Sequence, residues 1–474
     1  MRKLLILLNI TFFIISFILL PFAGRYNYAI LYLIVGMSLV SLCSYFVYTG
    51  KQHAFKGQYL RISYIFIIGY AIVFLQNNID LLLGYKSVNS ECFASSETIC
   101  ICALYSLIGL LSYIFGFVTS KNYYSGLSYD KRHDLITLMS DKYLLIQRIL
   151  FFIFVSIYLF FNALKILSGN YYYNEQTMFD NAGSLLNYSI VMIDVLMFTI
   201  LCSNVYNLKI KKIKLSFGKF IRINGLIFNI PMLIYLSFVF MTGDRGPILT
   251  AVLAFSITYV IACGKKLSFS FLLVMLVIGS IFFSVIGQMR RESNLLSLSE
   301  MITYKNSENN KSIMPATSEL AGSYNTFTYS VDRVPSRHPF FYGILQLRSI
   351  GYSVPFLYRF IPFVYSDKNY ENNSVSYCTY LIQGLNRTYG NGTSILADIY
   401  LDFGLIGIIV IMFIIGRLVI RLDYELFYGV SSFWFLVAVI FFSYSLYLSR
   451  STLSTPLYYI VPSCIVFYCR KYIK

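Results

Sequence analysis

The chain has little charge and almost no tryptophan. Only 12% of its 474 residues are Asp, Glu, Lys or Arg, and it holds one Trp against 42 Phe and 43 Tyr. Soluble domains typically carry about 25% charged residues. With 57% hydrophobic residues, so low a charge content excludes a soluble globular enzyme and also a disordered chain. The apolar surplus indicates a chain that lies in lipid.

Signatures of nucleotide or metal chemistry are also missing. The sequence contains no Walker A loop, no Gly-rich dinucleotide loop and no His-Glu-x-x-His zinc motif. Its nine Cys are scattered, and Cys100 and Cys102 have the wrong spacing for a zinc site. We therefore expect no metal and no cofactor. The net charge of +17 suits anionic lipid at a membrane surface better than a nucleic acid.

Apolar runs long enough to cross a bilayer recur along the chain. A helix of about 20 residues spans ~30 Å of hydrocarbon at 1.5 Å per residue, and helices satisfy every backbone group in lipid. The predicted fold class is an all-α polytopic membrane protein with about twelve transmembrane helices. We place them at 4–22, 28–49, 62–83, 98–118, 149–168, 186–208, 223–242, 247–263, 268–287, 393–415, 427–448 and 453–469.

Lysine and arginine are distributed unevenly between the two ends of these helices. Most cations of the short connections fall on the side of the N-terminus, whereas the opposite connections hold Arg25, Lys86, Arg245 and Arg450. Because positive charge is retained on the cytoplasmic side, this distribution predicts that both termini are cytoplasmic.

The connection between the ninth and tenth predicted helices is far longer than the others. Residues 288–391 would lie on the outer face, between a membrane domain of nine helices (1–287) and one of three helices (392–474). Its stretch 339–365 is apolar, aromatic and Arg-bearing, which is typical of short helices in the membrane interface. Structureless loops of this length are uncommon unless functional, so we interpret the segment as a partly folded external cap.

Arginines on the predicted outer face are the main candidates for anion binding. Arg245 lies in the tight turn TGDRGPI, where Asp244 can orient its guanidinium group. Alternatively, Asp244 and Arg245 could form an ion pair that only closes the turn and binds no ligand. Guanidinium groups match phosphate oxygens bidentately, so several that converge would hold a pyrophosphate. The other candidates are Arg290, Arg291, Arg348, Arg359 and Arg450.

One histidine and one pair of carboxylates complete the candidate site. His338, in SRHPF, is the single His of the predicted outer face. As a neutral imidazole it could take a proton from a sugar hydroxyl or hold that hydroxyl in place, or it could simply cap a turn before Pro339. Asp398 and Asp402, four residues apart, would share one helix face, where one could act as a base or both could pair with arginine.

The order of these motifs resembles the Wzy-type O-antigen and oligosaccharide repeat-unit polymerases. The resemblance rests on the GDRG turn, on HPFFYG and LRSIGYSVPFLYRFIP in the late loop, and on NGTSILADIYLDFGLIGIIVIMFIIG after it. It covers roughly residues 225–420, while the first six predicted helices match only in character.

The resemblance implies an integral-membrane, inverting and metal-independent glycosyltransferase at the outer face of a bacterial inner membrane. It would transfer a growing glycan from undecaprenyl pyrophosphate to the next lipid-linked repeat unit, with a chain-length regulator as its protein partner. Arg245, oriented by Asp244, and the loop arginines would hold the departing pyrophosphate, with His338 acting on the acceptor hydroxyl. An O-antigen ligase and a lipid-linked oligosaccharide flippase remain alternatives.

Overall fold

A computed structural model describes residues 1–52, 55–120, 140–167, 183–211, 213–268, 312–353, 366, 368–429 and 431–471, together with the single residues 270, 274 and 279. Every regular element in these ranges is a helix. The chain divides into two compact units, each assembled from separate segments. Unit 1 comprises 1–128, 308–424 and 445–458, and unit 2 comprises 129–307, 425–444 and 459–474.

Eight helices in the described ranges are long and apolar enough to span a bilayer. Each coincides with a predicted apolar run, because helix formation in lipid depends on the length of the run itself. They are α1 (Arg2–Leu19, continued by η1 at Leu20–Phe22), α2 (Tyr28–Gly50), α3 (Ile62–Leu82), α4 (Thr98–Thr119), α6 (Asp141–Leu167), α8 (Gly183–Ile210), α11 (Gly246–Cys263) and α19 (Ile395–Phe427).

The predicted count of twelve spans is not confirmed. The run 223–242 forms α10 (Leu226–Met241), which follows α9 (Phe217–Asn224) across a bend of 95° and gives a ninth span only if the pair is counted together. The runs 427–448 and 453–469 form α20 (Ser432–Tyr444) and α21 (Thr455–Tyr468), of 13 and 14 residues. Helices of that length reach only about 20 Å, less than the ~30 Å hydrocarbon core. The run 268–287 lies almost wholly outside the described residues.

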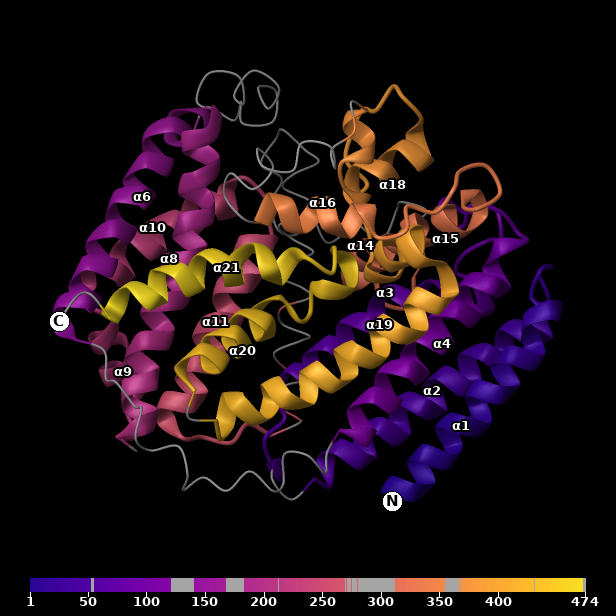
Figure 1. Ribbon diagram of the computed structural model, residues 1–474, viewed down its shortest axis with the longest axis horizontal. Coiled ribbons are helices and arrows are strands. Elements are labelled where there is room, and N and C mark those ends of the chain that lie inside the picture. The colour runs from indigo at the N-terminus through magenta and orange to yellow at the C-terminus, as the bar shows by residue number, and fades with distance from the viewer. Residues whose placement is uncertain are drawn as a thin grey trace. The chain divides into compact units, whose positions relative to one another are not determined.

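Unit 1 is built on helices that pack side by side. Helices α1, α2 and α4 contact one another, and α3 packs against α2 and α4 (Figure 1). α4 and α19 meet backbone to backbone at Gly116 and Gly416, where an added Cβ would collide with a carbonyl oxygen of the facing helix. Small residues permit such close approach between membrane helices. α19 bends at Gly404, whose φ of +61° suits glycine.

The described part of 288–391 belongs to unit 1 and forms short helices. These are η4 (Pro315–Thr317), α14 (Ser318–Gly322), α15 (Tyr324–Arg333), α16 (Ile344–Ser353), η6 (Asn369–Glu371) and α18 (Ser374–Gln383). We call them together the cap helices. Their position in a membrane interface, and the division of the chain into two membrane domains and an external loop, stay predictions.

Polar side chains on α3 hold the first described residues of the segment 288–391, which start at Ser312. The carboxylate of Asp80 accepts a hydrogen bond from Ser312 Oγ at 2.6 Å, and Gln76 Nε2 donates to the same hydroxyl at 3.0 Å. The Asn77 amide donates to the carbonyl oxygen of Ala321 at 2.6 Å. All three α3 side chains are buried. Polar groups in a membrane helix are costly unless protein partners satisfy them, and the cap segment supplies those partners.

Unit 2 contains α6, α8, α9, α10, α11, α20 and the part of α21 from Tyr459 onward. α8 is central in its contacts, since α6, α9, α11 and α20 all pack against it, and α10 packs against α6 and α11 (Figure 1). The bend between α9 and α10 falls at Gly225, which has a φ of +82°. There Arg148 of α6 donates a hydrogen bond to the carbonyl oxygen of Ile223 at 2.7 Å.

Candidate functional site

The buried carboxylate of Asp398 connects three elements of unit 1 to α19. It accepts hydrogen bonds from Gln346 Nε2 of α16 at 2.6 Å, from the Ser374 hydroxyl at the start of α18, and from the Leu453 amide at 2.8 Å. Leu453 follows η7 (Leu448–Arg450). Both carboxylate oxygens are thus engaged by protein donors. Asp398 joins the elements that carry two candidate arginines, Arg348 and Arg450, and the tyrosines beside the candidate histidine.

Asp402, one turn further along α19, holds the beginning of α16. Its carboxylate accepts hydrogen bonds from the amide nitrogens of Gly343, Leu345 and Gln346 at 3.1, 3.2 and 2.9 Å. The first amide groups of a helix lack intrahelical partners, and a carboxylate there is favoured by the helix dipole. The preceding residue, Tyr342, is 78% exposed and has a φ of +51°, a strained conformation for a side chain of its size.

Arg348 lies on α16, directly after this anchored turn. Its side chain is 8% exposed, and its guanidinium group donates to the backbone carbonyl of Glu371 in η6. A buried guanidinium group needs partners for its five donors, and carbonyl or phosphate oxygens supply them. The structure therefore holds a cation between α16 and η6.

His338 lies between the end of α15 and α16, half-buried against two tyrosines of α18. Its ring centre lies 5.8 Å from that of Tyr380 and 6.1 Å from that of Tyr377, both in edge-on orientation. Burial, followed by the charges of Arg333 and Arg337, lowers the pKa of His338 below its ordinary value. The imidazole is therefore neutral at neutral pH and retains a nitrogen that can accept a proton.

Arg450 lies at the end of η7 and pairs with Glu319 of α14. The two side chains approach to 3.7 Å between Nη1 and Oε1, and the guanidinium group also stands over the ring of Tyr447 at 5.8 Å. Both charged groups of the pair are partly exposed, at 24% and 43% of their side-chain surface. An ion pair that water reaches adds little stability, so the pairing leaves this cation available to a stronger anion.

The GDRG turn, which carries Arg245 and Asp244, belongs to unit 2 and connects α10 to α11. Gly243 has a φ of +71°, and Pro247 occupies the first turn of α11, as the motif predicts. The Asp244 carboxylate accepts a hydrogen bond from the Gly246 amide at 3.1 Å. The side chain of Asp244 thereby closes the turn, and the half-buried Arg245 lies directly before the first residue of α11.

Three predicted site residues, Arg290, Arg291 and Arg359, lie outside the described residues. Within the ranges that the structure does describe, no group of three His, Cys, Asp or Glu side chains is arranged to hold a metal ion.

Several residues of this site were missed by sequence reasoning. Gln346, Ser374, Tyr377 and Tyr380 are polar or aromatic residues without a motif, and their roles depend on which elements meet. The sequence did predict the two carboxylates to which the polar groups bind, since Asp398 and Asp402 are four residues apart and so are expected on one helix face. The arrangement brings onto one framework an imidazole, two guanidinium groups and exposed aromatic surface, a set suited to an anionic leaving group and a hydroxyl acceptor.

The chain is similar to a known protein family along nearly its whole length. The sequence model of the family described as "O-antigen polysaccharide polymerase Wzy" matches residues 5–474, essentially the whole chain. No curated protein and no solved structure matches the chain.

Proposed function

Because the chain belongs to the O-antigen polysaccharide polymerase family Wzy, we propose that it joins oligosaccharide repeat units carried on undecaprenyl pyrophosphate into a surface polysaccharide. The family implies lipid-linked oligosaccharide substrates in a membrane. In the proposed reaction the growing glycan leaves its pyrophosphate and is attached, with inversion, to a hydroxyl of the next lipid-linked unit.

One observation carries the proposal for the site. Asp398 binds at once to α16, to α18 and to the segment after η7. These elements carry Arg348, the tyrosines around His338, and Arg450. We assign the two guanidinium groups to the pyrophosphate, where they oppose the charge that develops as the glycosidic bond breaks.

His338 is assigned to the acceptor. A glycosyl acceptor hydroxyl must lose its proton as it attacks, and a neutral imidazole within reach can accept that proton or orient the hydroxyl. The lowered pKa of His338 supports this role, since it keeps the ring unprotonated at neutral pH. Tyr377 and Tyr380 are assigned to hold the ring in place.

Arg245 and Asp244 receive a separate role on unit 2. We propose that Arg245 binds a phosphate group and that Asp244 fixes the turn through the Gly246 amide. This assignment depends on the outward orientation predicted from the charge distribution, with the active site on the outer face of the inner membrane. Arg290, Arg291 and Arg359 are further proposed pyrophosphate ligands.

Purified protein tests the proposed reaction. In detergent, with undecaprenyl-pyrophosphate-linked repeat units and without nucleotide or ion gradient, the wild type should form a ladder of longer glycans with inverted linkage. A transporter would form none, and a ligase would form none without a lipid A core acceptor. Arg348→Ala should reduce the rate at least about 100-fold, in the range of lost electrostatic stabilisation.

An exposed arginine of the same segment provides a matched control. Arg387 lies in the exposed stretch after α18, and Arg387→Ala should extend glycans at the wild-type rate. Equal rates for Arg348→Ala and the wild type would show that Arg348 does not act on the pyrophosphate. A wild-type protein without ladder formation would remove the polymerase proposal itself.

A further inference from the structure

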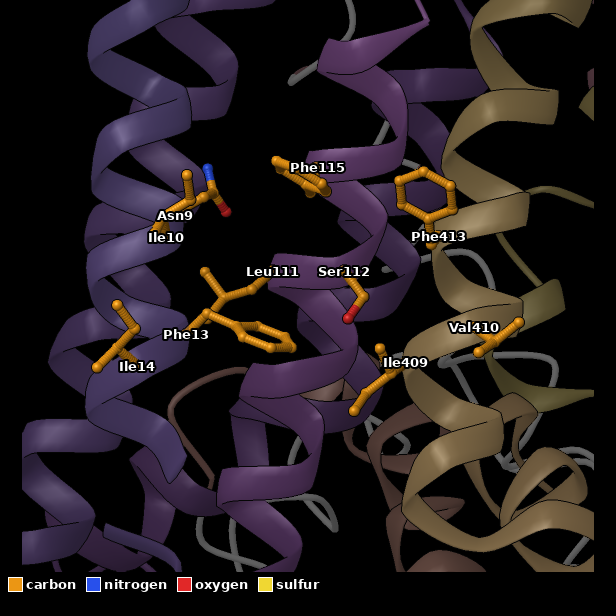
Figure 2. A pocket seen from close by; sticks show the side chains of 10 residues that line it. All are labelled: Asn9, Ile10, Phe13, Ile14, Leu111, Ser112, Phe115, Ile409, Val410 and Phe413. Atoms are coloured by element: carbon orange, nitrogen blue, oxygen red, sulfur yellow. The ribbon is translucent and has the colours of Figure 1, made fainter. Parts of the chain in front are cut away.

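A groove with hydrocarbon walls lies within unit 1, between α1 and α19 and over α4. Figure 2 shows the rings of Phe13, Phe115 and Phe413 around it, one from each of these helices. Its volume is about 420 Å³, within the range of about 300–1,000 Å³ that small-molecule sites occupy. None of the ten side chains that line it carries a charge.

The two polar side chains in this lining do not present polar atoms to the groove. Asn9 donates its amide to the carbonyl oxygen of Leu5 at 2.9 Å, within its own helix. Asn9 Oδ1 and Ser112 Oγ are buried, and neither has a hydrogen-bond partner among the described residues. An occupant of the groove therefore meets hydrocarbon and aromatic surface almost exclusively, which suits an apolar chain.

The edges of the groove face away from the protein. Ile14 on α1 is 55% exposed and Val410 on α19 is 50% exposed. Both lie inside membrane-length helices, where the surroundings of an exposed side chain are lipid. A hydrocarbon chain can thus enter the groove sideways from the bilayer.

The groove is lined in part by α19, the helix that also carries Asp398 and Asp402 of the candidate site. Val410 and Phe413 follow the bend of α19 at Gly404 by six and nine residues, which corresponds to about 9–14 Å along the helix beyond the bend. A lipid whose phosphates bind near Arg348 would direct its tail along α19 and into the groove at this depth. An outer-leaflet acyl chain ends near the bilayer midplane, about 15 Å below the headgroups, whereas a polyprenyl chain is long enough to continue past it.

We propose that this groove binds the polyprenyl tail of the lipid-linked substrate. The inference rests on the proposed function for the identity of the lipid. Binding there would position the pyrophosphate without any contact to the reacting sugars. The groove would then affect the affinity for lipid-linked donor and leave the rate of glycosyl transfer at saturation unchanged.

Photolabelling tests the occupant directly. Purified full-length protein in lipid nanodiscs would be irradiated with a diazirine-bearing polyprenyl phosphate, and the labelled peptides mapped. We expect labels on α1, α4 and α19, removed by unlabelled polyprenyl phosphate and not by phosphatidylglycerol. Equal competition by phosphatidylglycerol, or wild-type cross-links that join α1 to a second copy of the chain at this groove, would overturn the proposal.

A groove-filling variant with a matched control completes the test. Val410→Trp should raise the KM for lipid-linked donor about fivefold with kcat within twofold, since it displaces part of the tail. Ile414→Trp, on the same helix at 54% exposure and outside the lining, should leave KM unchanged. Equal KM values for both variants would refute binding of the polyprenyl tail in the groove. Labelling does not require glycosyl transfer, so labelled α1, α4 and α19 without ladder formation would refute the polymerase proposal alone.

Discussion

The carboxylate of Asp402 accepts a hydrogen bond from the amide nitrogen of Gln346 at 2.9 Å and so fastens the first turn of α16 to α19. Two further amides, those of Gly343 and Leu345, donate to the same carboxylate. Arg348 follows two residues after Gln346. Asp402 therefore fixes the position of a candidate pyrophosphate ligand through the backbone.

Replacing Asp402 should destabilise α16 in proportion to the donors left without an acceptor. Asp402→Ala should lower the free energy of unfolding by about 2–4 kcal/mol, because hydrogen bonds to a charged group contribute about 1.5–3 kcal/mol each and are not additive. Asp402→Asn keeps one acceptor oxygen and should lose about 1 kcal/mol. Thermal unfolding in detergent measures both, and a wild-type unfolding temperature for Asp402→Ala would contradict this account.

The pH dependence of polymerisation should reflect the lowered pKa of His338. An ordinary histidine is half-protonated near pH 6.5. Burial and the charges of Arg333 and Arg337 lower the pKa of His338 below that value, so the neutral ring persists to a lower pH. Activity should therefore be retained as the pH falls through about 6.5. It should be lost only at lower pH, where the His338 ring becomes protonated.

Removing one of the nearby cations should shift the acid limb of the pH profile, that is, the pH range in which activity is lost on acidification. In Arg337→Gln the protonated imidazole is less disfavoured, so the pKa of His338 rises and the acid limb moves to higher pH. Ladder formation between pH 5 and pH 8 at low ionic strength measures the shift, since salt screens an exposed charge. His338→Ala should abolish the limb, and an unchanged limb in that variant would assign it to another group.

The contact between α4 and α19 should not tolerate a side chain at either glycine. A Cβ on Gly416 would meet the carbonyl oxygen of Tyr113, and one on Gly116 would meet that of Phe413. Gly416→Leu should destabilise the protein by more than about 3 kcal/mol through overpacking and reduce its amount in the membrane. Gly36→Leu, on α2 with open space around its Cβ position, serves as the control and should accumulate normally.

The pair formed by Arg450 and Glu319 should matter for substrate and little for stability. Glu319→Gln removes an exposed ion pair and should change the free energy of unfolding by less than about 1 kcal/mol. Arg450→Ala should raise the KM for lipid-linked donor about tenfold, as expected for a lost phosphate contact. Steady-state kinetics in detergent distinguish the two, and an equal KM for Arg450→Ala and the wild type would exclude a pyrophosphate role.

The GDRG turn allows structure and function to be separated within one motif. Asp244→Ala removes the acceptor of the Gly246 amide and should reduce stability by about 1 kcal/mol, whereas Asp244→Asn preserves it. Arg245→Ala should leave membrane abundance unchanged and yield cells with single repeat units in place of a polymer ladder. Normal ladders at normal abundance would show that Arg245 does not act on the substrate.

Most membrane helices could be predicted from the sequence. For the two C-terminal helices, the length of the apolar run did not predict the length of the helix. The apolar runs 427–448 and 453–469 are long enough to cross a bilayer. However, their helices end after 13 and 14 residues, and the chain between them turns through Ser445 and η7. Hydrophobicity reports that a segment avoids water and does not report whether lipid or protein surrounds it.

The candidate site was predicted less completely. Arg348, Arg450, His338 and Asp398 were selected as charged or titratable residues next to apolar runs, and the structure places all four in unit 1. Their partners were not predicted, because Ser374, Gln346 and Leu453 have no distinguishing spacing. Each becomes relevant only through its hydrogen bond to Asp398.

The sequence alone determined that this protein is a helical membrane protein of the Wzy family, because the length of an apolar run and the order of motifs are local properties of the chain. Only the tertiary structure decided that one carboxylate joins residues 24, 52 and 55 positions away, and that three helices enclose a hydrocarbon groove. Both features depend on which helix faces meet, and that is settled by packing between distant segments.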